Sequence, residues 1–149
     1  MSHVKTTEVI CQDLECLKKA VSLFPKLKWK EAQKKFEWFG EWVQDYSQTD
    51  AAYKHGIDPS TYGQCDHCVE LDGCKYSIGV VKRADGQGYS LVWDFWGCGR
   101  IIDDYIGHSG EKLMTAYNTE YVAAYAAANG YMLQQEINAE GNIVMTMLK

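Results

Sequence analysis

The feature that most constrains the fold is a run of alternating side chains in the middle of the chain. Residues 76–81 read YSIGVV, residues 84–88 form the turn-like segment ADGQG, and apolar and polar side chains largely alternate over residues 89–96. Alternation is the period of a β-strand, and a short connection makes neighbouring strands pair antiparallel. The pattern therefore predicts a β-hairpin over residues 76–96. Its expected core face carries Tyr89, Leu91, Trp93 and Phe95.

A second hairpin is expected directly before it, in residues 63–79 (GQCDHCVELDGCKYSIG). Asp72-Gly73 is a strong signal for a two-residue turn. Such a turn places His67 opposite Ile78, and paired residues share a face of the sheet. One face would then carry Cys65, His67, Val69, Leu71, Cys74, Tyr76 and Ile78. The other face would carry Cys68, Glu70, Lys75, Ser77 and Gly79.

Two amphipathic helices are expected on either side of these hairpins. The first begins at the N-cap Asp13 and ends before Pro25. The second begins at residue 109 or 110 and ends at Asn129-Gly130, a good helix stop. Their apolar residues mostly recur every three or four positions, as on one face of a helix. These residues are Leu14, Leu17, Val21 and Phe24 in the first helix and Leu113, Tyr117, Tyr121, Ala124 and Ala128 in the second.

Further strands are expected at both ends of the chain. Residues 3–10 read as a strand, and residues 131–137 and 143–148 read as a closing hairpin around a turn at 138–142. Residues 27–43 read as two short strands around a turn, with a helix as the competing interpretation.

No helix or strand is predicted for the remaining segments. The helices and strands predicted above together define the fold class. Residues 44–62 are a polar excursion and residues 97–108 a polar loop. Strands joined by tight turns form an antiparallel sheet, and amphipathic helices can cover one of its faces. We therefore expect one α+β domain over residues 1–149, an antiparallel sheet built from hairpins with two amphipathic helices packed on one face.

Charge and hydropathy argue against two classes of partner. The net charge is −5, whereas binding duplex nucleic acid requires several cationic side chains on phosphates. No apolar run approaches the roughly 18–20 residues of a membrane span. The first residues, MSHVKTT, contain no apolar segment of the secretory type. We therefore expect a cytoplasmic protein whose six cysteines are reduced.

The cysteines raise the question of a metal. Cys65, Cys68 and Cys74 have a knuckle-like spacing, and Cys98, His55 or His67 could supply a fourth zinc ligand. The expected hairpin register opposes this, because it directs Cys68 away from Cys65 and Cys74. We therefore expect free thiols and no cofactor, with zinc as the alternative.

Several polar and aromatic residues are candidates for a ligand site. Trp96, or Trp42, could stack a nucleotide base if one face of the sheet is open. The GxG around Cys98 is a weak anion-binding signal, and no nucleophile elbow, phosphate-binding loop or dinucleotide fingerprint is present. The candidate ligand-binding residues are His67, Asp94, Trp96, Arg100, Asp104 and His108.

Four segments together carry a family resemblance. They are MSHVKT at the start, DLECLKKA, YSIGVVKRADGQGYSLVWDFWG, and AYNTEYVAAYAAANGYMLQQEINAEGNIVMTM near the end. This ordered set resembles the hypothetical chloroplast reading frame thirty-five family, also called domain of unknown function twelve fifty-seven. The resemblance implies a small α+β domain, and the region around Cys65–Cys74 is closer to the bacteriophage members. It supplies no activity, cofactor or catalytic residue.

The expected function is that of a binding module rather than an enzyme. We expect a homo-oligomer that holds a small anionic or nucleotide ligand, or a host protein, in a phage accessory or counter-defence role. One alternative is a small enzyme acting on a nucleotide or phosphorylated substrate, with His67, Asp94, Asp104 or His108 as acid–base groups. The other alternative is a zinc-stabilised interaction protein.

Overall fold

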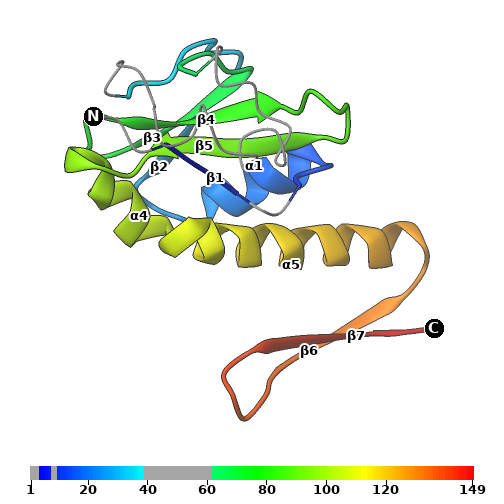
Figure 1. Cartoon of the computed structure of the whole chain (residues 1–149). Coiled ribbons are helices and arrows are strands. Elements are labelled where there is room, and N and C mark those ends of the chain that lie inside the picture. The colour runs from blue at the N-terminus through cyan, green and yellow to red at the C-terminus, as the bar shows by residue number, and fades with distance from the viewer. Residues whose placement is uncertain (1–3, 8–9, 39–61) are drawn as a thin grey trace.

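The computed structural model describes residues 4–7, 10–38 and 62–149. Its elements confirm the α+β class (Figure 1). In chain order they are β1 Val4–Thr6, α1 Leu14–Ser22, β2 Leu27–Lys30, β3 His67–Leu71, β4 Ser77–Lys82, β5 Tyr89–Asp94, the 3-10 turn η2 Gly97–Gly99, α4 Arg100–Ile106, the 3-10 turn η3 His108–Gly110, α5 Glu111–Ala128, β6 Met132–Ile137 and β7 Ile143–Leu148. None of the helices in these ranges has the length and apolar character that crossing a membrane requires.

The main sheet has five antiparallel strands in the order β1-β5-β4-β3-β2. Its centre is the β4–β5 hairpin, which confirms the hairpin predicted for residues 76–96. Leu91 and Trp93 of β5 are completely buried. The turn is closed by the Arg83 N–H, which donates to the Gly88 carbonyl at 2.8 Å, and Gly86 has a φ of 76°. That positive φ is a conformation that glycine adopts without a steric penalty.

The predicted register of the β3–β4 hairpin is wrong by two residues. His67 pairs with Val80 rather than with Ile78. The turn at Asp72-Gly73 does form, since the Cys74 N–H donates to the Leu71 carbonyl at 3.1 Å. The next residues leave the ladder, however, and the Cys74 thiol approaches the Cys98 carbonyl at 3.4 Å. A slip of two residues keeps every strand side chain on its predicted face, because the period of a strand is two.

Both predicted helices form, and their first turns confirm the local signals. The Asp13 carboxylate accepts hydrogen bonds from the N–H groups of Glu15 (2.9 Å) and Cys16 (3.2 Å), as an N-cap does. The Tyr117 hydroxyl of α5 accepts hydrogen bonds from the N–H groups of Gln12 (2.9 Å) and Asp13 (3.2 Å). This hydroxyl therefore ties α5 to the start of α1.

Residues 97–108 are not the predicted loop but mostly helix. Ile102 and Ile106 of α4 are both completely buried. They lie one turn apart on the same side of the helix, so the core accepts both side chains. A spacing of four between two isoleucines was the signal that could have identified this helix.

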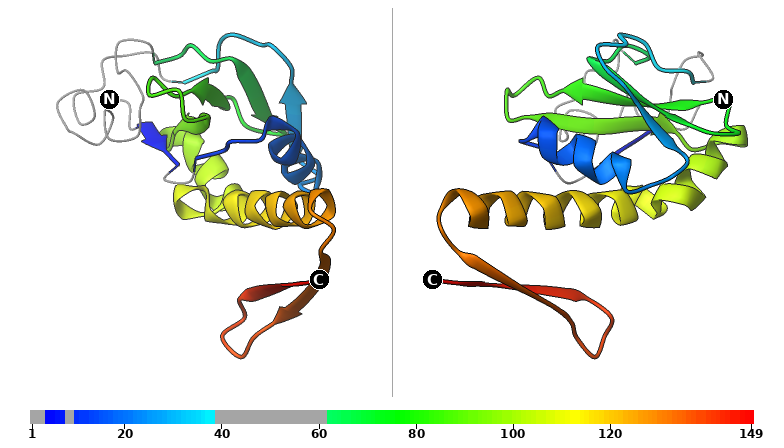
Figure 2. Two further views of the ribbon diagram at one scale, coloured as in Figure 1. Left: turned by 90° about the vertical axis from the view of Figure 1, so that its right-hand side faces the viewer. Right: turned by 180° about the vertical axis from the view of Figure 1, so that it is seen from behind.

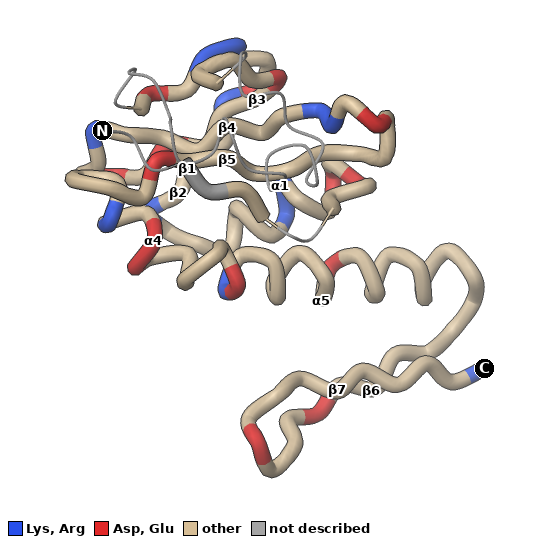
Figure 3. Tube along the Cα trace, viewed as in Figure 1, with Lys and Arg blue, Asp and Glu red and all other residues tan. Residues whose placement is uncertain are grey.

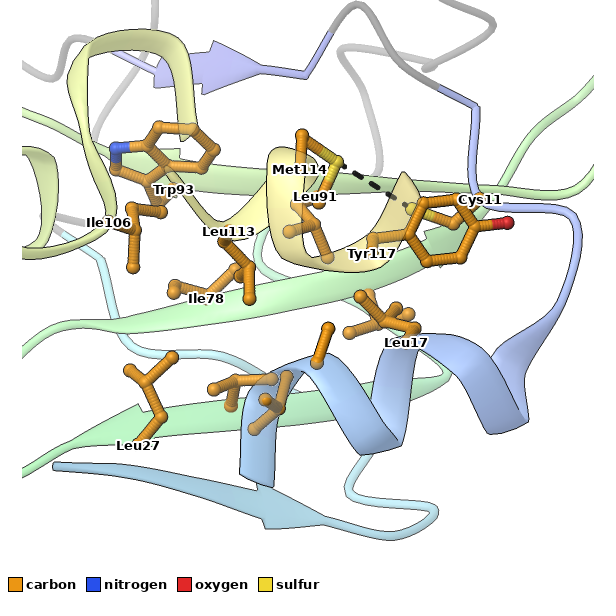
Figure 4. Packing of buried hydrophobic residues seen from close by; sticks show 14 of the residues in the cluster. Cys11, Leu17, Leu27, Ile78, Leu91, Trp93, Ile106, Leu113, Met114 and Tyr117 are labelled. Carbon is orange, nitrogen blue, oxygen red and sulfur yellow. Dashed lines mark hydrogen bonds between the residues drawn. The ribbon is translucent and has the colours of Figure 1, made fainter. Parts of the chain in front are cut away.

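The main core lies between the sheet and the helices (Figure 4). Three helices, α1, α4 and α5, contribute side chains to it. The helix residues in this cluster are Cys16, Leu17, Ala20, Val21, Ile102, Ile106, Leu113, Met114 and Tyr117. The sheet residues facing them include Leu27, Val69, Leu71, Ile78, Val80, Leu91 and Trp93.

The other face of the sheet carries a second, smaller cluster. It contains Phe36, Cys65, Cys68 and Val92. The Phe36 ring occupies the space that a side chain at Gly79 would need. This part of the sheet is therefore covered rather than open for stacking, and Trp42 lies outside the described residues.

The chain before β3 agrees only in part with the predictions. The strand predicted over residues 3–10 pairs with β5 along β1, and the Thr7 N–H extends the pairing by donating to the Leu91 carbonyl at 3.0 Å. Residues 8–9 are outside the described set. β2 confirms the first of the two strands predicted in 27–43, and Lys35 forms an isolated bridge with Gln64. The excursion predicted for 44–62 lies, except for Tyr62, outside the described residues.

The closing hairpin forms as predicted, but it does not join the main sheet. β6 and β7 make a separate two-stranded sheet that lies beyond α5 (Figures 1 and 2). The C-terminal hairpin is therefore a second sheet in addition to the antiparallel sheet that was predicted. Within the described main sheet, β1 and β2 are the two edge strands. β1 pairs with β5, and β2 pairs with β3.

Candidate functional site

The end of β5 and the start of α4 hold three of the predicted site residues in one place. Asp94 is almost completely buried, and its carboxylate accepts a hydrogen bond from the Trp96 N–H at 3.0 Å. The Trp96 carbonyl accepts in turn from the Gly99 N–H at 3.0 Å. The Arg100 guanidinium then lies over the Trp96 ring, 4.9 Å from its centroid. We call Trp96 and Arg100 the Trp–Arg pair.

The Trp–Arg pair is exposed while its support is buried. Trp96 is 48% exposed and Arg100 is also on the surface. No ion pair to Arg100 is formed by any residue that the structure describes. A guanidinium in that position can bind a carboxylate or phosphate through two parallel hydrogen bonds.

His108 follows the other end of the same helix and begins the 3-10 turn η3. Its Nδ1 lies 3.2 Å from a carboxylate oxygen of Asp103, and its side chain is 78% exposed. Asp104 is exposed on the neighbouring position of α4. Gly107, with a φ of 94°, ends α4 and separates it from His108.

His67 lies in a different environment at the start of β3. Its Nδ1 accepts a hydrogen bond from the Ala32 N–H at 2.9 Å, so the proton of a neutral ring is on Nε2. Trp29 and Tyr89 lie beside the ring, with centroids at 5.3 and 6.4 Å. The hydrogen bond explains why Ala32 has a φ of 57°, an uncommon value for a residue with a side chain.

Glu31 connects this histidine to α1. One carboxylate oxygen accepts from the Trp29 indole N–H at 2.6 Å and pairs with the Lys18 ammonium at 3.0 Å. The other oxygen is 3.7 Å from the His67 Nδ1. The hydrogen bond from Lys18, followed by that from Trp29, lowers the pKa of the Glu31 carboxyl. Glu31 therefore holds its negative charge next to His67.

The predicted site residues thus do not form one site. Tyr89, beside His67, begins β5, and Asp94 ends it. Five steps along a strand span about 17 Å. The structure brings Asp94, Trp96 and Arg100 together, puts His108 at the far end of α4, and leaves His67 in a separate cluster.

Sequence reasoning missed the neighbours of His67. Lys18, Trp29 and Glu31 come from segments more than 35 residues earlier in the chain. Alternation within β2 puts Trp29 on the same face as Leu27. This was the only local signal in the sequence for the position of any of these neighbours. An open cavity of about 450 Å³ next to this cluster is bordered by Tyr89, Gln12 and Lys82.

The four candidate zinc ligands form two separate pairs. Cys65 and Cys68 belong to the small cluster with Phe36, which corrects the prediction that they lie on opposite faces. Cys74 instead contacts Cys98 on the other side of the sheet. Among the described residues, no group of three histidines, cysteines or carboxylates is placed to hold a metal ion. His55 lies outside these residues.

Thiol titration of the native protein at pH 8 should separate the cysteines into two groups. Burial raises the pKa of both Cys11 and Cys65 from 9.0 to about 12, so only about one such thiol in ten thousand is ionised at this pH. We expect Cys74 and Cys98, which are partly exposed, to react first. The slow group should be Cys11, Cys16, Cys65 and Cys68.

The control for this titration is the same protein in denaturant, where all six thiols should react at one rate. Rapid reaction of all six in the native protein would contradict the burial described above. Metal analysis of the same sample tests the zinc alternative, which predicts that a chelator releases additional reactive thiols.

Comparison of the chain with known protein families, with curated proteins and with solved structures gives no match. The resemblance to the chloroplast reading frame thirty-five family therefore stays a prediction.

Proposed function

We propose that the chain is a small non-enzymatic binding module that holds an anionic ligand with a planar ring, such as a nucleotide, at the Trp–Arg pair. The observation that carries the proposal is an indole 48% exposed with a guanidinium 4.9 Å from its ring centroid. A base can stack on such an indole, and its phosphate can bind the guanidinium.

The rigidity of the support favours binding. Asp94 and Gly99 hold the backbone on both sides of Trp96, as described above. A backbone segment that is already held by hydrogen bonds loses little conformational entropy when a ligand binds. The backbone that carries the Trp–Arg pair is therefore preorganised, although the pair lies at the surface.

Replacing either member of the pair should weaken nucleotide binding without unfolding the protein. Stacking on an aromatic side chain contributes about 1–3 kcal/mol per base, so Trp96→Ala should raise the dissociation constant about tenfold or more. Arg100→Ala should do the same, and Arg100→Lys should recover only part of the affinity, because lysine keeps the charge but not the planar fork. The measurement is tryptophan fluorescence and thermal shift against a panel of nucleotides and inorganic phosphate.

The matched control for these variants is Ile101→Ala. Ile101 is 46% exposed and follows Arg100 directly, and it is not needed to bind a base or a phosphate. If no nucleotide raises the melting temperature of the wild-type protein, the proposal fails.

A host protein is the other class of partner. Such a partner would bury Ile101 together with Trp96, as interface hot spots do.

A second candidate function is an enzyme acting on a nucleotide or phosphorylated substrate. The His108–Asp103 contact favours it, because a carboxylate that orients a histidine is a common general-base arrangement. Turnover of a bound nucleotide that His108→Gln abolishes, with binding unchanged, would support the enzyme over the binding module.

The cellular setting that we propose is the host cytoplasm. The resemblance to bacteriophage members and the cysteine content support it. The net charge of −5 supports a partner other than duplex nucleic acid.

A further inference from the structure

The C-terminal arm, residues 121–149, is the most exposed apolar part of the described chain. It comprises the second half of α5 and the β6–β7 hairpin. Met132 and Ile137 are each 72% exposed, and Tyr125 is 50% exposed. A two-stranded hairpin with no further cover is at best marginally stable in water. The arm therefore needs a surface to pack against.

The described part of the same chain does not provide this cover. The hairpin lies beyond α5, on the side away from the main sheet (Figure 2). A cavity of about 390 Å³ remains between α5 and β7. Its α5 side is largely polar and is lined by Thr115, Asn118, Thr119 and Val122. Ile143 and Met145 of β7 thus border a gap and a largely polar helix surface rather than a core.

The charge of the arm argues for a second copy as the occupant. Its 29 residues contain only Glu136, Glu140 and Lys149 as charged side chains (Figure 3). It therefore lacks the cationic cluster that lipid headgroups or nucleic acid would select. Two such arms also repel each other little, and depletion of charge is typical of subunit interfaces. A standard interface uses about 20–30 residues per partner, which the arm can supply.

The free edge of β7 suggests how the two copies meet. Natural edge strands are usually protected by charges or proline, yet β7, from Ile143 to Leu148, contains neither. β6 differs, since it carries Glu136. An antiparallel edge is complementary to itself around a two-fold axis, because each copy offers the same donors and acceptors.

The ladder also identifies which backbone groups of β7 face outward. The Asn138 N–H donates to the Asn142 carbonyl at 2.9 Å, so this pair occupies a hydrogen-bonded position. Positions alternate along an antiparallel ladder, so the next hydrogen-bonded pair is Glu136 with Val144. Met145, which pairs with Gln135, therefore directs its N–H and carbonyl to the free edge.

From these observations we propose that the chain forms a two-fold homodimer in which β7 pairs antiparallel with β7 of a second copy. The two hairpins then form one four-stranded sheet, and the side chains of the two β7 strands that share a face contact each other across the new ladder. This dimer is independent of the ligand proposed for the Trp–Arg pair.

The test is the mass of the full chain in solution, measured by light scattering or sedimentation. The wild-type protein should have twice the single-chain mass of 16.9 kDa. Met145→Pro should reduce it to 16.9 kDa, since proline removes an outward N–H but no bond to β6. The matched control is Gln135→Pro, which removes the equivalent N–H on the opposite edge and should stay dimeric.

A second pair of variants leaves the backbone donors intact. Thr146→Lys places a lysine of each copy on the same face of the shared sheet, next to the new ladder, and should also give a monomer. Gln134→Lys, its cross-strand neighbour on β6, should stay dimeric. The proposal is overturned if the wild-type protein is monomeric, if Thr146→Lys is dimeric, if both proline variants have the same mass, or if the mass exceeds two chains.

Discussion

Replacing Gly99 with alanine should lower the free energy of unfolding by about 3 kcal/mol. Gly99 has an ordinary helical φ of −66°, so the backbone alone would accept a side chain. A Cβ atom there would overlap the backbone carbonyl of Asp94, however, and would also press on the Tyr76 ring. A carbonyl at the end of a paired strand cannot move aside as a flexible side chain could. Urea denaturation followed by circular dichroism measures the loss.

Gly97→Ala is the control for this substitution. Gly97 lies in the same 3-10 turn, has a φ of 61°, and has open space around its Cα. Alanine should cost only about 1 kcal/mol there, the penalty of a left-handed residue. Equal losses for the two variants would mean that backbone conformation, and not the contact with Asp94, makes position 99 a glycine. Because Gly99 also supports Trp96, Gly99→Ala should weaken ligand binding as well.

Truncating Trp93 to alanine should have a still larger effect, a loss of about 3–5 kcal/mol in the free energy of unfolding. Trp93 is completely buried between the sheet and the helices and is the largest side chain in the core (Figure 4). Its removal leaves a cavity, because the surrounding strands and helices relax only in part. Thermal and urea denaturation of the purified variant measure this loss.

Trp93→Phe keeps an aromatic ring in the core and removes the indole nitrogen. The Trp93 Nε1 is buried and has no hydrogen-bond partner among the described residues. Leaving a buried donor unpaired costs about 1–3 kcal/mol, so removing it offsets part of the lost packing. We therefore expect Trp93→Phe to lose much less stability than Trp93→Ala. Equal losses for the two variants would contradict the combined effect of the retained aromatic ring and the removed, unpaired nitrogen.

The local elements were predictable because their signals are local. The β4–β5 hairpin follows from alternation over adjacent residues and a glycine-containing turn. The start of α1 follows from one carboxylate that accepts two N–H groups within three residues. Each of these patterns is complete within a few positions of the chain.

The helix α4 depended on tertiary contacts. Seven residues are too few to form a stable helix in water without packing. α4 exists because Ile102 and Ile106 reach the core beside α5. For the same reason, Trp96 and Arg100 could be identified from the sequence as candidate binding residues. The stacking of the Arg100 guanidinium on the Trp96 ring could not be predicted.

The sequence by itself determined which side chains of each strand share a face, since that depends only on the two-residue period of a strand. The tertiary structure decided the register of β3 against β4, where Cys74 leaves the ladder to contact the carbonyl of Cys98, 24 residues further along the chain. It also decided the neighbours of His67 and the separation of β6–β7 from the main sheet. Contacts between distant segments are set by packing, and no local pattern encodes which partner a buried or polar group will find.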